Sequence, residues 1–151
     1  MRHGSDLIGF HKMKYSNFRE NEMGDILQFE GKIVFDVVEQ MPEQVVSEMP
    51  IQAGILNPYG VVNAGAILWL ADVTATILVL GSSSLPTEGM AGFPLAITLN
   101  ANFISNQKEG TLRAVASFVK KGKRVNVVRT TVYGKKDRLI ADVTTNHVPA
   151  K

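Results

Sequence analysis

The sequence predicts an α+β fold, in which one long central helix packs against a curved antiparallel sheet of about five or six strands. Two observations lead to this class. Residues 57–81, NPYGVVNAGAILWLADVTATILVLG, enclose a long apolar segment between helix caps. Residues 95–148 alternate between polar and apolar side chains and are broken by hairpin-length turns, which is typical of antiparallel strands with one buried face.

The first part of the chain is polar and mixed over residues 1–25, and we expect it to form an arm or a short helix ahead of one domain, residues 26–151. Residues 26–40 have the composition of a strand. Residues 43–56 form a second extended segment that is interrupted by Pro50. These two segments are expected to make a hairpin at a sheet edge, because proline is tolerated there.

The central helix is expected between Asn63 and Gly81. The Asn63 side chain can accept a hydrogen bond from the first turn, and glycine is a natural helix stop. The segment is apolar on nearly every face, so we expect it to be buried all round. Asp72 is its only charged residue. Because a buried carboxylate must be paired, hydrogen-bonded or neutralised, Asp72 is either a functional group or a structural one that bonds a loop or Thr76.

The segment after the helix, residues 81–94, is a loop rich in Ser, Gly and Pro. A loop of this length is often a lid or part of a ligand tunnel, and the alternative is a mobile connection. Three or four strands follow, and the expected ones cover residues 95–105, 111–119, 124–133 and 138–148.

Composition excludes several classes of function. The 151 residues suffice for one domain with a core, and the absence of cysteine excludes disulfides and thiol chemistry. A net charge of +2 gives no argument for nucleic acid, and His3 and His11 lack the spacing of metal ligands. Neither a signal peptide nor a membrane-spanning run is visible. We therefore expect a cytoplasmic protein with no metal and no nucleic-acid or membrane partner.

The segment from Asn57 to Gly81 resembles the signature of hotdog-fold thioesterases of the phenylacetic-acid-degradation (PaaI-like) type. That signature has an Asn, then His-Gly-Gly, then Leu-Ala-Asp, and its counterparts here are Asn57, Asn63-Ala64-Gly65 and Leu70-Ala71-Asp72. The likeness extends over residues 30–148. Asn63 replaces the usual His, and Ala64 replaces the first Gly. The resemblance implies a hotdog fold, an acyl-CoA substrate and a homodimer or homotetramer.

The resemblance also implies the roles of the site residues. The acidic residue at the position of Asp72 is a general base on water or a nucleophile. The backbone N–H at Ala64, with Gly65 beside it, polarises the thioester carbonyl. The residue at Asn57 orients water or the carbonyl from across the dimer interface. Asn63 can donate a hydrogen bond to the carbonyl but cannot transfer a proton as His would. The chemistry agrees, because a helix N-terminus supplies free N–H groups and a favourable dipole for an oxyanion.

Substrate contacts are expected at two further places. Thr76 lies one helical turn beyond Asp72 on the same face. A basic turn is either a site for the coenzyme A phosphates or merely a solvated turn, and its residues include Lys121, Lys123 and Arg124. A second turn of this kind carries Lys135, Lys136 and Arg138. Coenzyme A is then part of the substrate, so no separate cofactor is expected. His147 has no visible partner and receives no role.

Three functions remain open at this point. The first is an acyl-CoA thioesterase that uses Asp72. The alternative is a non-catalytic hotdog protein that binds acyl-CoA or an acyl carrier, because the signature His and first Gly are replaced. A hotdog hydratase or dehydratase ranks last, because it needs a His close to Asp72 on the helix. The acyl group, the choice between dimer and tetramer, and the role of Asp72 as base or nucleophile are also open.

Overall fold

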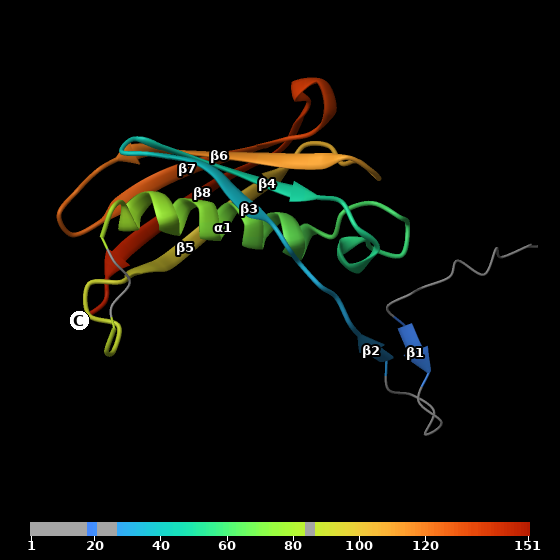
Figure 1. The fold of residues 1–151 in the computed structure, drawn as a ribbon, viewed down its shortest axis with the longest axis horizontal. Helices are drawn as coiled ribbons and strands as arrows, with labels where there is room; N and C mark the ends of the chain where they lie inside the picture. The colour runs from blue at the N-terminus through green and yellow to red at the C-terminus, as the bar shows by residue number, and fades with distance from the viewer. Residues whose placement is uncertain (1–17, 21–26, 84–86) are drawn as a thin grey trace, which may run out of the picture.

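One long helix lies against an antiparallel sheet in the computed structural model, which describes residues 18–20, 27–83 and 87–151 (Figure 1). The main sheet has six strands in the order β3-β4-β6-β7-β8-β5, and all neighbours are antiparallel. This confirms the predicted α+β arrangement. The strands are β3 (Asp36–Met41), β4 (Gln44–Pro50), β5 (Pro94–Phe103), β6 (Thr111–Lys120), β7 (Asn126–Tyr133) and β8 (Leu139–Pro149).

The helix α1 (Ala64–Leu80) begins and ends at the predicted caps. The Asn63 side chain accepts a hydrogen bond from the Gly65 N–H at 2.8 Å. At the other end, Gly81 has a φ of 63°, and its N–H donates to the Ile77 carbonyl at 3.0 Å. That backbone conformation favours glycine, so the sequence itself determines where the helix stops.

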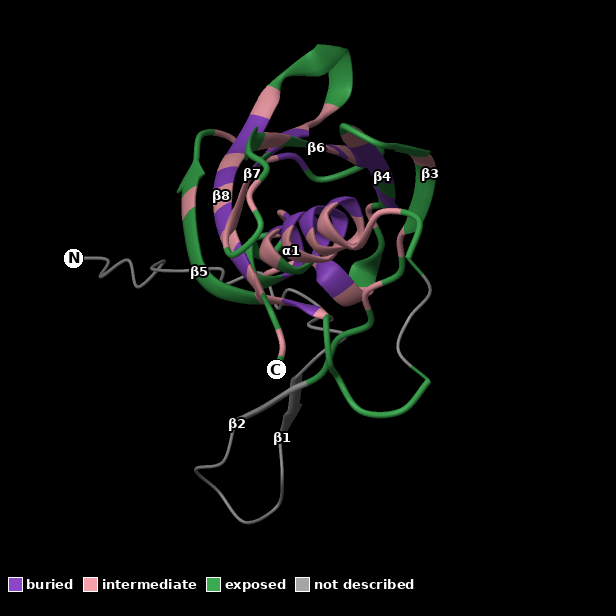
Figure 2. Ribbon diagram, turned by 90° about the vertical axis from the view of Figure 1, so that its left-hand side faces the viewer, coloured by how far each residue is buried: buried purple, intermediate pink, exposed green. Residues whose placement is uncertain are grey.

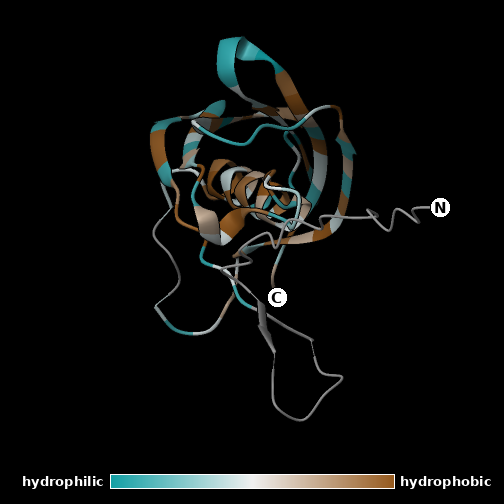
Figure 3. Ribbon diagram, turned by 90° about the vertical axis from the view of Figure 1, so that its right-hand side faces the viewer, coloured by the Kyte–Doolittle hydropathy of each residue, from teal (hydrophilic) through white to brown (hydrophobic). Residues whose placement is uncertain are grey.

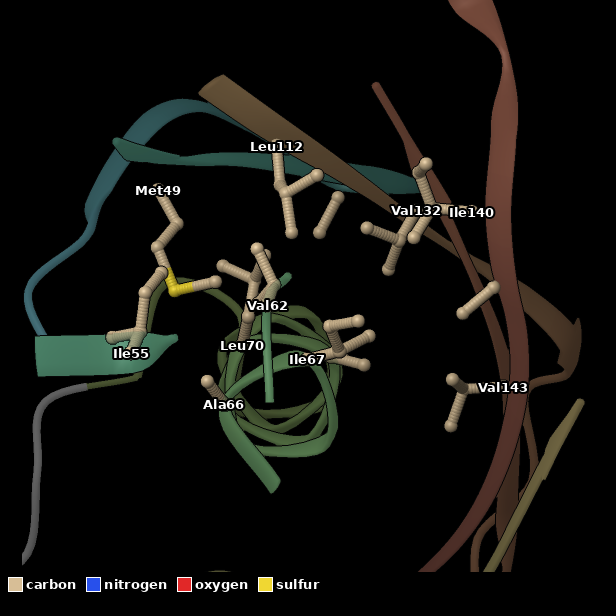
Figure 4. Packing of buried hydrophobic residues seen from close by; sticks show 13 residues of the cluster. Met49, Ile55, Val62, Ala66, Ile67, Leu70, Leu112, Val132, Ile140 and Val143 are labelled. Carbon is tan, nitrogen blue, oxygen red and sulfur yellow. The ribbon is translucent and has the colours of Figure 1, made fainter. Parts of the chain in front are cut away.

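The sheet curves over the helix, and the core fills the space between them (Figures 2 and 4). The N-terminal half of α1 packs on the first part of β6 and the last part of β7, for example through Ile67, Leu112 and Val132. The C-terminal half packs on the opposite ends of these strands, through Leu78, Ala116 and Val128 among others. The β6–β7 turn therefore lies near the C-terminal end of α1, and the β7–β8 connection lies near its N-terminal end.

The side of α1 that faces away from the sheet is not covered, contrary to the expectation of a helix buried all round. Trp69 is 46% exposed there, and Asp72, Val73 and Thr76 are partly exposed. The ring of Phe35 meets the edge of Trp69 with the centroids 5.6 Å apart and the planes at 85°. This open side gives a ligand or a second protein chain access to Asp72.

The prediction of one strand over residues 26–40 is wrong, because the structure has two separate strands there. The structure has β2 (Leu27–Phe29), which pairs with β1 (Phe18–Glu20) in a separate two-stranded sheet, and β3 starts only later. The break lies where two backbones come close, because a Cβ at Gly31 would be 2.8 Å from the Gly54 carbonyl oxygen. The predicted hairpin of β3 and β4 is present, with β3 at the sheet edge.

Two predicted segments are described only in part. The arm or short helix over residues 1–25 is described only at β1, which is a strand, and its other residues lie outside the described part. The loop over residues 81–94 is irregular where it is described, and residues 84–86 lie outside that part. Within the described ranges, no helix combines the length and the apolar character that crossing a bilayer requires.

The strand β5 forms the other edge of the sheet. Its register shifts between Ala96 and Thr98, so Ala96 pairs with His147 and Leu99 pairs with Thr145. These pairs lie on the inner face, because Thr145 and His147 are fully buried. Hydropathy follows the same division, with a largely hydrophobic helix inside the sheet and a hydrophilic β7–β8 connection at the top of the view (Figure 3).

Candidate active site

The start of α1 offers one free backbone donor. The Gly65 N–H is bonded to the Asn63 side chain, and the N–H groups of Ala66 and Ile67 are bonded to the Asn63 carbonyl at 3.0 and 3.3 Å. The Ala64 N–H has no acceptor among the described residues. Of the two expected oxyanion donors, Ala64 is therefore the free one, and Gly65 is engaged in the cap.

Alanine and asparagine fit the two positions at which the sequence departs from the signature. Ala64 is helical, and the positive φ values among the described non-glycine residues occur only at Lys136 and Asp137. A glycine is therefore not required at Ala64. At Gly65, a Cβ would lie 3.2 Å from the Asn63 side-chain oxygen, so the glycine allows the tight cap. Asn63 is exposed, and its amide nitrogen has no described partner.

Asp72 makes no hydrogen bond with any described residue, although it is partly buried. Its Oδ1 is inaccessible to solvent and has no partner. The expected structural alternative, a bond to Thr76 or to a loop, is therefore not present in the described chain. The buried polar residue of α1 with a structural role is Thr74, whose hydroxyl bonds Ser47 Oγ at 2.9 Å and the Leu70 carbonyl at 2.6 Å. An unpartnered buried oxygen of this kind is a mark of a functional site.

Asn57 shapes the loop that leads into α1. Its side-chain oxygen accepts hydrogen bonds from the N–H groups of Tyr59 at 2.9 Å and Val61 at 3.2 Å. Its backbone N–H also bonds the Val61 carbonyl at 2.7 Å. This is a side-chain-stabilised turn of the kind that asparagine favours. The amide nitrogen of Asn57 has no described partner, so it can still donate to a ligand.

The first basic turn connects β6 and β7 at the far end of α1 from Ala64. Lys121 is bonded to Glu43 at 2.8 Å and lies over the ring of Phe118, 5.0 Å from its centroid. Lys123 and Arg124 are exposed and have no described partner. The structure thus leaves two of the three expected cations free, and it places them away from the helix N-terminus.

The second basic turn lines a pocket of about 510 Å³, here called the basic pocket, at the near end of α1. Lys135 is bonded to Glu109 at 2.6 Å, and Arg138 is bonded to the Asn106 carbonyl. Lys108 and Lys136 have no described partner. The residues that line the pocket are Asn106, Gln107, Lys108, Glu109, Lys135, Lys136 and Arg138.

His147 received no role in the sequence analysis, and the structure places it inside the core. Its ring is fully buried, Nε2 lies 2.9 Å from Thr145 Oγ1, and Nδ1 has no described partner. Burial lowers the pKa of His147, and this is partly opposed by the negative charge of Asp72 and by the Pro94 carbonyl. The residue could have been found by extending the two-residue period of β8 beyond Val143.

A family model described as "Thioesterase superfamily" matches residues 59–141, which is more than half of the chain. The chain belongs to the thioesterase superfamily. Its helix and six-stranded sheet form the expected hotdog fold. Membership supports hydrolase activity of the thioesterase or esterase kind. No group of three or more metal-ligating side chains occurs in the described portion of this family member.

Known relatives of this thioesterase-superfamily chain agree with the assignment. "Putative esterase ComA2" of Bacillus subtilis is 30% identical over 105 residues, which are 70% of this chain and 80% of that protein. A thioesterase of Staphylococcus aureus is 26% identical with a TM-score of 0.68, over 78% of this chain and 93% of that one. A hypothetical thioesterase of Streptococcus pneumoniae, solved with coenzyme A, is 17% identical with a TM-score of 0.67. The match covers 78% of this chain and 86% of that one.

Proposed function

We propose that the protein is a cytoplasmic acyl-CoA thioesterase of the PaaI-like type. The observation that carries this proposal is Asp72, a carboxylate on the open side of α1 with no hydrogen bond to any described residue. The free N–H of Ala64 supports it, because an oxyanion needs such a donor. The solved relative that holds coenzyme A supports the substrate class.

The reaction needs little beyond these two groups. As general base, Asp72 takes a proton from water while the water oxygen attacks the thioester carbonyl carbon. The carbonyl oxygen becomes an oxyanion that the Ala64 N–H stabilises. When the carbonyl re-forms, the C–S bond breaks, and the coenzyme A thiolate leaves and takes up a proton. As nucleophile, Asp72 would instead attack the carbonyl carbon, the C–S bond would break with release of the coenzyme A thiolate, and water would hydrolyse the resulting anhydride to the free acid and the Asp72 carboxylate. Both routes give a free acid and coenzyme A.

Helix geometry indicates that one chain does not complete the site. Asp72 lies eight residues after Ala64, a rise of about 12 Å along the helix axis, whereas reacting atoms must approach to about 3–3.5 Å. We therefore propose a homodimer, or a tetramer of such dimers, in which Asp72 of one chain faces Asn57 and Ala64 of another. Thr76 and Trp69, on the same open side as Asp72, would border the acyl group.

The phosphates of coenzyme A have two proposed binding places. The sequence-based proposal is the turn with Lys121, Lys123 and Arg124. The basic pocket is the second, and its place next to the start of α1 favours it, because the thioester carbonyl must reach Ala64. Its unpaired cations are Lys108 and Lys136.

A non-catalytic acyl-CoA binding protein is the second candidate, and Asn63 is the observation that favours it. Its side-chain oxygen is committed to the helix cap, and an asparagine cannot transfer a proton as the signature His would. Such a protein would bind acyl-CoA through the same groups without turnover.

An assay over a panel of acyl-CoA esters, followed by release of free thiol, separates the two functions. We expect turnover with at least one ester and its loss in Asp72→Asn. Binding of acyl-CoA without thiol release from any ester would reject the thioesterase and support the binding protein.

A further inference from the structure

Two buried polar atoms lack a hydrogen-bond partner in the described chain, and they belong to Asp72 and His147. They are Oδ1 of the carboxylate and Nδ1 of the imidazole. A carboxylate oxygen requires a donor, and a protonated ring nitrogen requires an acceptor. Burying either atom without a partner is costly. The carboxylate could accept a hydrogen bond that the imidazole N–H could donate, so the two groups are complementary.

Thr145 bonds Nε2 of His147, so Nδ1 is the ring nitrogen left for another partner. Its hydroxyl lies 2.9 Å from Nε2. When this hydroxyl donates to Nε2, the neutral ring carries its hydrogen on Nδ1 and offers a donor there. The other tautomer would direct a lone pair from Nδ1 into the field of a carboxylate, which is unfavourable. In the tautomer in which Thr145 donates to Nε2, the ring can donate from Nδ1 to an anion.

Among the elements packed around the His147 ring, the charge that affects its pKa is that of Asp72 on α1. The helix α1 carries no other charged residue, and β5 carries none and contributes only the Pro94 carbonyl. On β7, Arg129 is exposed and bonded to Asp142 of β8 through Nε at 2.9 Å. Among the described groups, Asp72 is therefore the negative charge that acts on the ring, and the Pro94 carbonyl is the competing acceptor for its N–H.

We propose that His147 is a positioning residue for Asp72, whose Oδ1 it holds from Nδ1–H through one bridging water, since the two atoms are not bonded directly. The other carboxylate oxygen then faces the open side of α1, where the substrate arrives. This inference rests on the proposed function, because a fixed carboxylate serves either role of Asp72. The contact fixes the orientation of the carboxylate before substrate binds.

Three substitutions separate positioning from simple core packing. His147→Phe keeps a ring of similar size and removes the donor, whereas His147→Asn retains an N–H near the position of Nδ1. Thr130→Val is the matched control, because it removes a hydroxyl from the same inner face whose only described bond is a long one, 3.5 Å, to the Ala71 carbonyl.

The kinetic arm uses the best acyl-CoA ester and a pH series. We expect His147→Phe to lower kcat about tenfold, the effect of one lost charge-assisted hydrogen bond, with KM unchanged. The acid limb of the kcat/KM profile should move to higher pH. His147→Asn should recover most of the rate, and Thr130→Val should change neither quantity. A wild-type rate and profile in His147→Phe would overturn the inference.

The second arm uses NMR of the imidazole and needs no substrate. We expect nitrogen shifts that place the hydrogen of His147 on Nδ1, and a titration at lower pH in Asp72→Asn than in the wild type, because the charge that favours the protonated ring is gone. The same titration in both proteins would overturn the inference. A wild type that hydrolyses no acyl-CoA overturns the proposed function instead, and the titration still decides the contact between His147 and Asp72.

Discussion

The side-chain amide of Asn106 holds both backbone groups of Val62. Its oxygen accepts from the Val62 N–H at 3.2 Å, and its nitrogen donates to the Val62 carbonyl at 2.9 Å. Val62 comes directly before the Asn63 cap, so the loop that lines the basic pocket is fixed to the start of α1. A ligand whose phosphates occupy that pocket therefore lies close to the Ala64 N–H.

Removing the free cations of the basic pocket should weaken binding of coenzyme A esters. We expect the double variant Lys108→Ala, Lys136→Ala to raise KM about fivefold, since each exposed charge contributes about 0.2–1 kcal/mol. KM for the corresponding acyl-pantetheine, which lacks the nucleotide phosphates, should not change. The matched control is Lys123→Ala, Arg124→Ala. If only the control raises KM for the coenzyme A ester, the phosphates bind at the β6–β7 turn.

Ala64→Pro should remove the oxyanion donor and leave the helix intact. Proline suits the first position of a helix, and Asn63, with φ −64° and ψ 135°, already has the conformation required before proline. We expect kcat to fall about 10²–10³-fold, as for loss of one oxyanion-hole donor. Ala64→Ser, which retains the N–H, should keep the wild-type rate. Equal rates in the two variants would remove Ala64 from the site.

Mixing two inactive variants should restore activity if the site is shared between chains. In a dimer formed from Asp72→Asn and Ala64→Pro chains, one of the two sites has both groups intact. With random exchange, about a quarter of the wild-type rate should return, because half of the dimers are mixed and half of their sites work. Mass spectrometry would verify the exchange. Mixed dimers without activity would show that each chain builds its own site.

Asp72→Asn should abolish turnover without unfolding the protein. Loss of a general base costs about 10²–10⁴-fold in rate, and no hydrogen bond to a described residue is lost. Turnover and thermal unfolding are measured on the same preparation. A rate within a few-fold of the wild type, together with a lower melting temperature, would assign Asp72 a structural role.

The protein should lose stability as the pH falls below about 6.5, the ordinary value for histidine. The pKa of buried His147 is lowered, so the unfolded chain takes up a proton at a higher pH than the folded one, and acid favours unfolding. For one group the slope is at most about 1.4 kcal/mol per pH unit. Urea unfolding at pH 7.5 and 5.5 should show a smaller decrease in His147→Phe, which retains His3 and His11. The Asp142 carboxyl, whose pKa Arg129 lowers, contributes only at lower pH.

The elements that sequence could predict are those with local signals. Asn63 and Gly81 mark the ends of α1, and the alternation of β6 and β8 defines their inner faces. The strand over residues 26–40 was assigned wrongly because its break depends on the approach of Gly31 to Gly54, which are distant in sequence. Gly31 by itself indicates a bend or bulge in the sequence, but not its contact with Gly54.

The candidate site divides in the same way. Asp72 and Ala64 were found from one continuous stretch of chain. The basic pocket could not be predicted from one continuous stretch, because residues 106–109 and 135–138 come together only when β6 pairs with β7. His147 was within reach of the pattern on β8, but its relation to Asp72 depends on where α1 lies over the sheet.

The Asn63 cap leaves one backbone donor for the proposed reaction at the start of α1. Because the cap uses the Gly65 N–H, a developing oxyanion meets one backbone donor at this helix start. A bond whose leaving group departs easily needs less stabilisation of that oxyanion. Thiolates depart more readily than alkoxides or amines, because thiols are much stronger acids than alcohols or amines. If the proposed reaction takes place at this helix start, its single backbone donor should favour thioesters over oxygen esters and amides.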